Sequence, residues 1–162
     1  MPRDVVERGF NFAGDKQLLL DARARTFFWL TFPPKRLGAG TFCLTAMRDA
    51  RGAALAGNAR YRLRVPKDVP VGQFWSVIAY SAKTKTFIAN ASRVDASSYD
   101  RAALKANADG SPDLYLGPTA PQGLEGNWLP TGEDFFLMFR FYGPQPALFQ
   151  KAWTLPDPER LE

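Results

Sequence analysis

The sequence contains no histidine and a single cysteine, Cys43. Without histidine the chain has no Ser-His-Asp or Cys-His nucleophile system, no histidine-bearing metal site and no imidazole base near neutral pH. One cysteine cannot form an internal disulfide, and without histidine it leaves too few ligands for zinc. Any catalysis would use Asp, Glu, Lys, Tyr or Arg, and we expect neither a cofactor nor a bound metal.

Long apolar runs are also missing. No stretch approaches the roughly 20 apolar residues that a helix needs to span a bilayer, so the sequence predicts no membrane span. The first residues, MPRDVVERGF, lack the apolar core of an export signal. Localisation stays open between the cytoplasm and export with the signal already removed.

Charge of one sign is in modest excess. The sequence has 21 basic and 16 acidic residues, a formal net charge of +5. These charges are spread along the chain and form no block of like charges. We therefore expect no nucleic-acid partner.

What the sequence does have is a pattern typical of strands. Thirteen prolines and thirteen glycines separate short apolar runs. Residues 41–49 and 59–66 alternate with a period of two, and 72–90 predicts a hairpin with its tip at 82–85. The last strong strand is expected at 135–142.

Smaller elements are expected between and around these strands. DARG, residues 49–52, predicts a turn, and 113–116 predicts a short strand. The best helix candidate is 14–30, where Asp15 can cap a segment with apolar residues at three-to-four spacing. Residues 146–153 predict a turn of helix before an exposed tail.

Several motifs together resemble the family called domain of unknown function 1214. They are FWSVIAY (74–80), NADGSPDLYLGP (107–118), NWLP (127–130) and FFLMFRFYGP (135–144), with support from TFCLTAMRDARG, YRLRVP and Trp153. The likeness covers about residues 20–157. The chain resembles the C-terminal module of two-domain bacterial proteins in this family, here without the partner domain. The resemblance implies no catalytic residues.

The resemblance implies an all-β fold, an antiparallel β-sandwich of jelly-roll character. We expect the N-terminal helix predicted at 14–30 to pack on it. The expected organisation is a single domain over 1–162. Residues 1–40 would hold the helix and its lead-in, and 41–157 the β-sandwich.

Arg140 interrupts the otherwise uncharged strand expected at 135–142. It shares one face with Phe136, Met138 and Tyr142, and apolar residues on both faces indicate a strand covered on both sides or lying in a groove. A guanidinium stays charged, so a buried one needs an acceptor. That acceptor is either a carboxylate of the protein or an anionic group of a ligand held bidentately.

Four aromatic residues are candidates for a ligand-binding cleft beside Arg140. They are Trp75, Tyr115, Trp128 and Tyr142. Trp128 would either present a flat ring to a sugar or plug the open end of the sandwich. Trp75 also fits the core by its strand period, and sequence alone does not show that the four converge.

Two further motifs have simpler interpretations. Oxygen donors alternate in NADGSPD as in some calcium loops, but the glycine and the closing glutamate are not at the required spacing, so a turn explains the motif. Three arginines share one face of the strand at 59–66, a pattern that favours a solvated strand face over a polymer-binding one. These residues are Arg60, Arg62 and Arg64.

As function the sequence favours a ligand-binding or accessory module for a carbohydrate-like or anionic small molecule. One alternative is a hydrolase that works without histidine through loop carboxylates, although spacing singles out no catalytic residue. The candidates are Asp95, Asp100, Glu125, Glu133 and Asp134. The other alternative is a structural module that assembles as a homo-oligomer.

Overall fold

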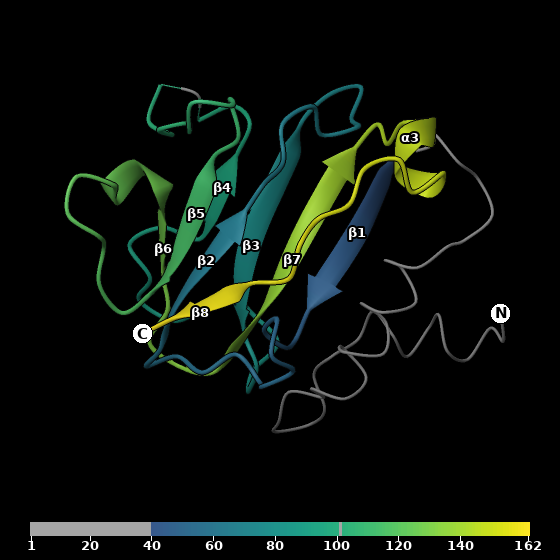
Figure 1. The fold of residues 1–162 in the computed structure, drawn as a ribbon. Coiled ribbons are helices and arrows are strands. Elements are labelled where there is room, and N and C mark those ends of the chain that lie inside the picture. The colour runs from purple at the N-terminus through teal and green to yellow at the C-terminus, as the bar shows by residue number, and fades with distance from the viewer. Residues whose placement is uncertain (1–39, 101) are drawn as a thin grey trace, which may run out of the picture. The chain divides into compact units, whose positions relative to one another are not determined.

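The computed structural model describes residues 40–100 and 102–162, which form a mainly β structure (Figure 1). These residues belong to one compact unit, Leu37–Glu162. In chain order the elements are β1 (Thr41–Ala46), β2 (Arg60–Arg64), β3 (Trp75–Ser81), β4 (Asp95–Ser97), β5 (Asp113–Gly117), the 3-10 helix η1 (Glu125–Asn127), β6 (Trp128–Pro130), β7 (Phe135–Tyr142), α3 (Pro146–Phe149) and β8 (Glu159–Leu161).

The strands form two four-stranded sheets. In the first, ordered β1-β7-β3-β4, the central β7 pairs antiparallel with both β1 and β3. In the second, ordered β6-β5-β2-β8, β2 pairs antiparallel with β5 and β8. β5 and β6 pair in parallel, which departs from the antiparallel expectation. Residues 118–127 carry the chain back to the start of β5, and a parallel pair requires such a return.

Both sheets turn apolar side chains into one shared core. Because side chains alternate along a strand, every second residue faces inward. β2 contributes Tyr61 and Leu63, and β5 contributes Leu114 and Leu116. β7 supplies the largest series from one strand, Phe135, Leu137, Phe139 and Phe141. Each such side chain stabilises the fold by about 1.5–3 kcal/mol when fully buried.

The opposite face of β7 is buried as well. Phe136 and Met138 point away from the shared core yet are only 8% and 1% exposed. Their neighbours Cys43 on β1 and Ile78 on β3 are also buried. Both faces of β7 are therefore buried, as expected of a strand that is covered on both sides or lies in a groove.

The turn expected at 49–52 is present. The Gly52 N–H donates to the Asp49 carbonyl oxygen at 2.8 Å. The Asp49 carboxylate accepts the N–H groups of Arg51 and Ala53, each at 2.9 Å. Gly52 has a φ of 82°, a conformation that glycine adopts without strain.

Two expectations about strands need correction. The hairpin of 72–90 has its tip where predicted, but its second arm is reduced to a single bridge between Tyr80 and Phe87. The C-terminal tail is not simply exposed, because β8 pairs with β2 (Figure 1). The helix expected at 14–30 lies outside the described residues.

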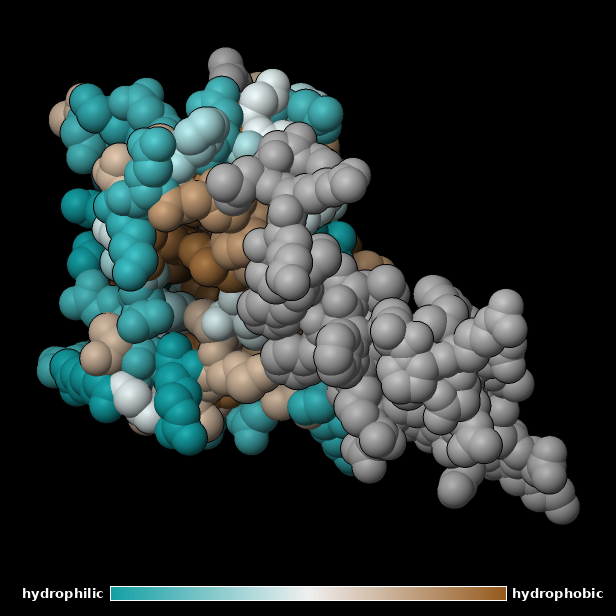
Figure 2. All heavy atoms as spheres, turned by 90° about the vertical axis from the view of Figure 1, so that its right-hand side faces the viewer, coloured by the Kyte–Doolittle hydropathy of each residue, from teal (hydrophilic) through white to brown (hydrophobic). Residues whose placement is uncertain are grey.

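The segment before β8 covers an apolar edge of the core. A cavity of about 200 Å³ is lined by side chains of β1, β2, β3 and β7 and by Leu155 and Pro158. Figure 2 shows apolar side chains in a hollow on the side that carries β1.

No helix in residues 40–100 or 102–162 is long and apolar enough to cross a membrane.

Candidate functional site

A cleft of about 700 Å³ lies between three loops. Residues 65–73 join β2 to β3, Ser98 follows β4, and residues 104–112 precede β5. The first and third of these segments are held together, because the Val65 N–H donates to the Pro112 carbonyl oxygen at 2.9 Å. The walls are therefore fixed by backbone hydrogen bonds.

The lining of this cleft combines apolar walls with a few polar groups. The apolar side chains include Val65, Val69, Val71, Trp75 and Leu104. The polar groups that line it are Lys67, Asp68, Gln73, Ser98 and Asp109, all of them exposed except the half-buried Ser98. Small-molecule sites typically have this composition, in which the apolar surface provides affinity and the polar groups fix orientation.

Trp75 is the predicted site residue that lies in this cleft. Its ring stacks on Phe139 with a centroid distance of 5.4 Å, and the residue is only 6% exposed. Its backbone N–H donates to the Ser98 hydroxyl at 3.3 Å, and the Ser98 N–H donates to its carbonyl oxygen at 3.0 Å. Trp75 is thus part of the core and of the cleft wall, and it offers no exposed platform for a sugar ring.

Tyr115 and Trp128 lie together elsewhere. They are register partners on β5 and β6, and their neighbours Leu114, Leu116 and Leu129 point into the core. Both side chains are therefore on the outer face of the second sheet, and both are half-buried. The Trp128 indole N–H donates to the Gly117 carbonyl oxygen at 3.0 Å, which ties this ring to β5.

Arg140 and Tyr142 lie on the outer face of the first sheet. The Arg140 Nη2 donates to the Tyr80 hydroxyl oxygen at 2.6 Å, and Nη1 lies 3.5 Å from the Tyr142 hydroxyl oxygen. In the described part of the chain no carboxylate pairs with Arg140. The protein supplies tyrosine hydroxyls where the sequence led us to expect an acid.

Electrostatics around Arg140 follow from its partial burial. Burial acts to lower the pKa of its guanidinium, but the hydrogen bond to Tyr142 and the nearby Tyr80 outweigh this, so the pKa is raised. Cys43 is its register partner on β1. Burial raises the pKa of the Cys43 thiol, and the charge of Arg140 only partly opposes this. The thiol therefore stays neutral near pH 7 and supplies no counter-charge.

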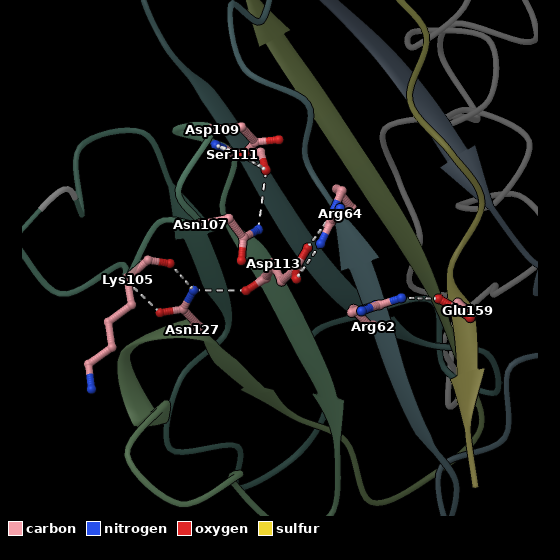
Figure 3. Close-up of polar contacts among 9 residues, drawn as sticks. All are labelled: Arg62, Arg64, Lys105, Asn107, Asp109, Ser111, Asp113, Asn127 and Glu159. Carbon is pink, nitrogen blue, oxygen red and sulfur yellow. Dashed lines mark hydrogen bonds and ion pairs between the residues drawn. The ribbon is translucent and has the colours of Figure 1, made fainter.

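The NADGSPD motif forms a hydrogen-bonded turn beside an ion pair (Figure 3). The Asp109 carboxylate accepts the Ser111 N–H at 3.0 Å and the Ser111 hydroxyl at 2.6 Å. The Asp113 carboxylate accepts Arg64 Nε at 2.8 Å and Nη2 at 3.1 Å. The described residues contain no cluster that could hold a metal ion, and the motif's oxygens are engaged in these internal contacts.

Asn127 is a structural residue that the sequence did not single out. Its side chain accepts the Lys105 N–H at 2.7 Å and donates to the carbonyl oxygens of Lys105 and Asp113, at 2.9 and 2.8 Å (Figure 3). The residue is 1% exposed. Asn127 thereby joins the loop before β5 to the strand itself. In the sequence, the one feature that could have pointed to it is its position next to the loop tryptophan Trp128.

The three arginines of β2 are each held by internal partners. Arg62 bonds Glu159 at 2.5 Å, and Arg60 donates to the Glu162 carbonyl oxygen at 2.9 Å. Arg64 pairs with Asp113 as described. The outer face of β2 is accordingly a polar face whose cations are engaged by the protein.

The structure therefore does not bring the five predicted site residues together. Arg140 and Tyr142 share one outer face, Tyr115 and Trp128 share the other, and Trp75 lies at the cleft. Sequence reasoning missed most of the cleft lining, including Lys67, Gln73 and Leu104. These residues lie in loops, whose side chains follow no periodic pattern.

The geometry defines an all-β protein with two sheets around one core and a cleft between loops. A family model described as a protein of unknown function, DUF1214, matches residues 40–146. The chain belongs to this family. No curated protein matches it.

Two solved structures are similar to the chain. One is the VPA0106 protein of Vibrio parahaemolyticus, with 23% identity and a TM-score of 0.67, over 92% of this chain and 36% of that one. The other is an uncharacterised protein of Burkholderia cenocepacia, with 16% identity and a TM-score of 0.44, over 98% and 48% of the two chains. The first likeness supports the fold, and the chain spans less than half the length of either protein.

Proposed function

We propose that the protein is a non-catalytic ligand-binding or accessory module whose ligand occupies the cleft beside Trp75. The observation that carries this proposal is a cleft of about 700 Å³ with apolar walls and a few polar groups. Ligand sites of this kind measure roughly 300–1,000 Å³. A carbohydrate-like molecule fits such a lining, since its C–H faces contact apolar walls while its hydroxyls meet Gln73 and Ser98. An anionic group would meet Lys67 but also the carboxylates of Asp68 and Asp109, so the lining suits a carbohydrate-like ligand better.

Nothing favours the hydrolase alternative. A general acid needs a raised carboxyl pKa, but the described carboxyl groups with a shifted pKa, Asp109, Asp113 and Glu125, are all lowered. Hydrogen bonding to Ser111 lowers the first, hydrogen bonding to Arg64 the second, and backbone hydrogen bonds the third. Asp100 pairs with Arg93 at 2.8 Å. These carboxylates form hydrogen bonds or ion pairs within the fold.

Self-association is the remaining alternative. Large apolar side chains are exposed at Tyr99, Phe87 and Met47, by 72%, 52% and 49%. Tyr99 lies tilted against Phe74, and Phe87 stacks on Tyr80, so each of these two rings has a partner within its own chain. Sedimentation equilibrium would detect a homo-oligomer directly.

The finer features of the fold belong to the same proposal. We propose that the two sheets form a β-sandwich of jelly-roll character, with a helix from 14–30 and a single domain over 1–162. The shared core supports the sandwich, and the apolar spacing of 14–30 supports the helix.

The cleft is tested by filling it. Ala106 lines the cleft and is exposed, whereas Ala108 is exposed and does not line it. Ala106→Trp therefore places a large ring in the cleft, and Ala108→Trp is its matched control. The probe is N-phenyl-1-naphthylamine, whose fluorescence rises in apolar surroundings.

We expect saturable probe binding by the wild type, about tenfold weaker binding by Ala106→Trp, and unchanged binding by Ala108→Trp. Wild-type binding without saturation would overturn the proposal, as would equal binding by both variants. Circular dichroism establishes that both variants fold. A displacement series with sugars and small carboxylates would then separate the two ligand classes.

A further inference from the structure

We propose that Arg140 forms a second ligand site, separate from the cleft, which binds a carboxylate attached to a flat apolar group. It lies on the outer face of the first sheet, whereas Trp75 lines the cleft from the core side. The inference rests on what surrounds the guanidinium and does not depend on the cleft being occupied.

The first observation is a half-buried charge whose partners among the described residues are neutral. Arg140 bonds the hydroxyl of Tyr80 and lies near that of Tyr142, and a guanidinium has more N–H donors than these contacts use. Hydroxyls satisfy hydrogen bonds but do not neutralise charge. A charge withdrawn from water is costly unless an opposite charge meets it, so the site favours an anion.

The second observation is that other arginines of the described chain do have acids. Arg62, Arg64 and Arg93 each approach a carboxylate within 2.8 Å or less. These three arginines thus have acids as partners, whereas Arg60 bonds a backbone carbonyl oxygen. Among the described residues no carboxylate pairs with Arg140, although it lies on a central strand of its sheet.

The third observation is that the tyrosines are held in place by stacked rings. Tyr142 stacks on Phe74 with a centroid distance of 4.0 Å. Tyr99 also lies against Phe74, with a centroid distance of 4.6 Å. Tyr80 stacks on Phe136 at 5.3 Å. Fixed hydroxyls orient the guanidinium before a ligand arrives, and such preorganisation favours binding.

The same rings define the class of ligand. Aromatic side chains lie near Arg140 on both sides along its face, at Tyr142 and at Tyr80. A planar carboxylate can meet the guanidinium bidentately while its apolar body contacts the half-buried ring of Tyr142. Tyr80 is only 6% exposed and already stacks on Phe87 and Phe136, so it supplies its hydroxyl and not a contact surface. Benzoate carries both features and is the probe.

The experiment compares benzoate with benzamide, a neutral molecule of nearly the same shape, by calorimetric titration of the full chain at constant ionic strength. We expect saturable benzoate binding and at least about tenfold weaker benzamide binding. Arg140→Gln should weaken benzoate about tenfold, and Arg140→Lys should give an intermediate loss because lysine keeps the charge without the planar fork. Arg51→Gln removes the same charge at an exposed position and should change nothing.

Equal binding of benzoate and benzamide would overturn the proposal, as would unchanged benzoate binding by Arg140→Gln. If Arg140→Gln does not fold, the two probes on the wild type and the Arg140→Lys variant still decide the question. To show that the Arg140 site and the cleft are separate, each variant is also titrated with the probe of the other site. Arg140→Gln should leave naphthylamine binding intact, and Ala106→Trp should leave benzoate binding intact.

Discussion

Arg64 and Arg140 are arginines on the outer faces of the two sheets, and they are held in opposite ways. Arg64 meets the Asp113 carboxylate through two hydrogen bonds, at 2.8 and 3.1 Å. Arg140 meets tyrosine hydroxyls and, within the described residues, no acid. The side chain of Arg64 is 48% exposed, whereas Arg140 is half-buried. The arginine that has a carboxylate partner is therefore also the one with more contact with water.

This contrast separates a structural arginine from a candidate binding one. A charge that stabilises a fold is expected to have its counter-charge within the protein. A charge kept for a ligand is expected to lack one, at some cost in stability.

The largest effect is expected at Asn127, which supports the strand that carries Asp113. Asn127→Ala leaves the N–H and carbonyl of Lys105 and the carbonyl of Asp113 without their present partner. At about 1 kcal/mol for each lost hydrogen bond, the free energy of unfolding should fall by about 3 kcal/mol. Urea unfolding measures it, and a loss below about 1 kcal/mol would show that water replaces these bonds.

The next effect compares the two arginines directly. Arg64→Ala should lower the free energy of unfolding by about 1–3 kcal/mol, because Asp113 is buried and loses its charged partner. Arg140→Met should change it by less than about 1 kcal/mol or raise it, since an apolar side chain replaces a half-buried charge that no described carboxylate neutralises. Both are measured by urea unfolding. Equal losses would contradict the distinction between the residues.

Acid should expose the same difference. The hydrogen bond from Arg64 lowers the pKa of Asp113 in the folded protein. The resulting stability is present above the unfolded pKa of about 3.9 and is lost as pH falls through the folded pKa. The stability gap between the wild type and Asp113→Asn should therefore shrink below about pH 4. For Arg140→Met the gap should stay constant, because none of the described carboxylates pairs with Arg140. Urea unfolding at a series of pH values would test both expectations.

The smallest effect is expected at Arg62. Its bond to Glu159 is solvent-accessible, with side chains 36% and 56% exposed. Arg62→Gln should cost less than about 1 kcal/mol, and the cost should decrease in high salt. Thermal unfolding at two salt concentrations would show this. A larger loss, insensitive to salt, would mean that β8 depends on this ion pair.

The sequence predicted those parts of the fold that depend on local alternation. β1, β2 and β7 follow from inward-facing apolar residues two apart, and β7 was predicted with its observed bounds. β8 was not predicted, because Glu159–Leu161 has no pattern of its own and becomes a strand by pairing with β2. Pairing of residues distant in sequence is not encoded in a short window.

The candidate site was less predictable for the same reason. Arg140 could be singled out because a charge in an apolar strand is unusual. Its partner Tyr80 could not, because they are 60 residues apart and β3 had been assigned by its apolar period alone. The cleft near Trp75 depends on how three loops pack, which period and composition do not describe.

The most direct test follows the side-chain Nε–Hε resonances of Arg140 and Arg64 by NMR during a benzoate titration. Each resonance is assigned by its loss in the corresponding lysine variant. The Arg140 resonance should shift and saturate, with a dissociation constant on the order of 1 mM for so small a ligand, while that of Arg64 stays fixed. An Arg140 resonance that does not move, or one that moves together with that of Arg64, would contradict the account.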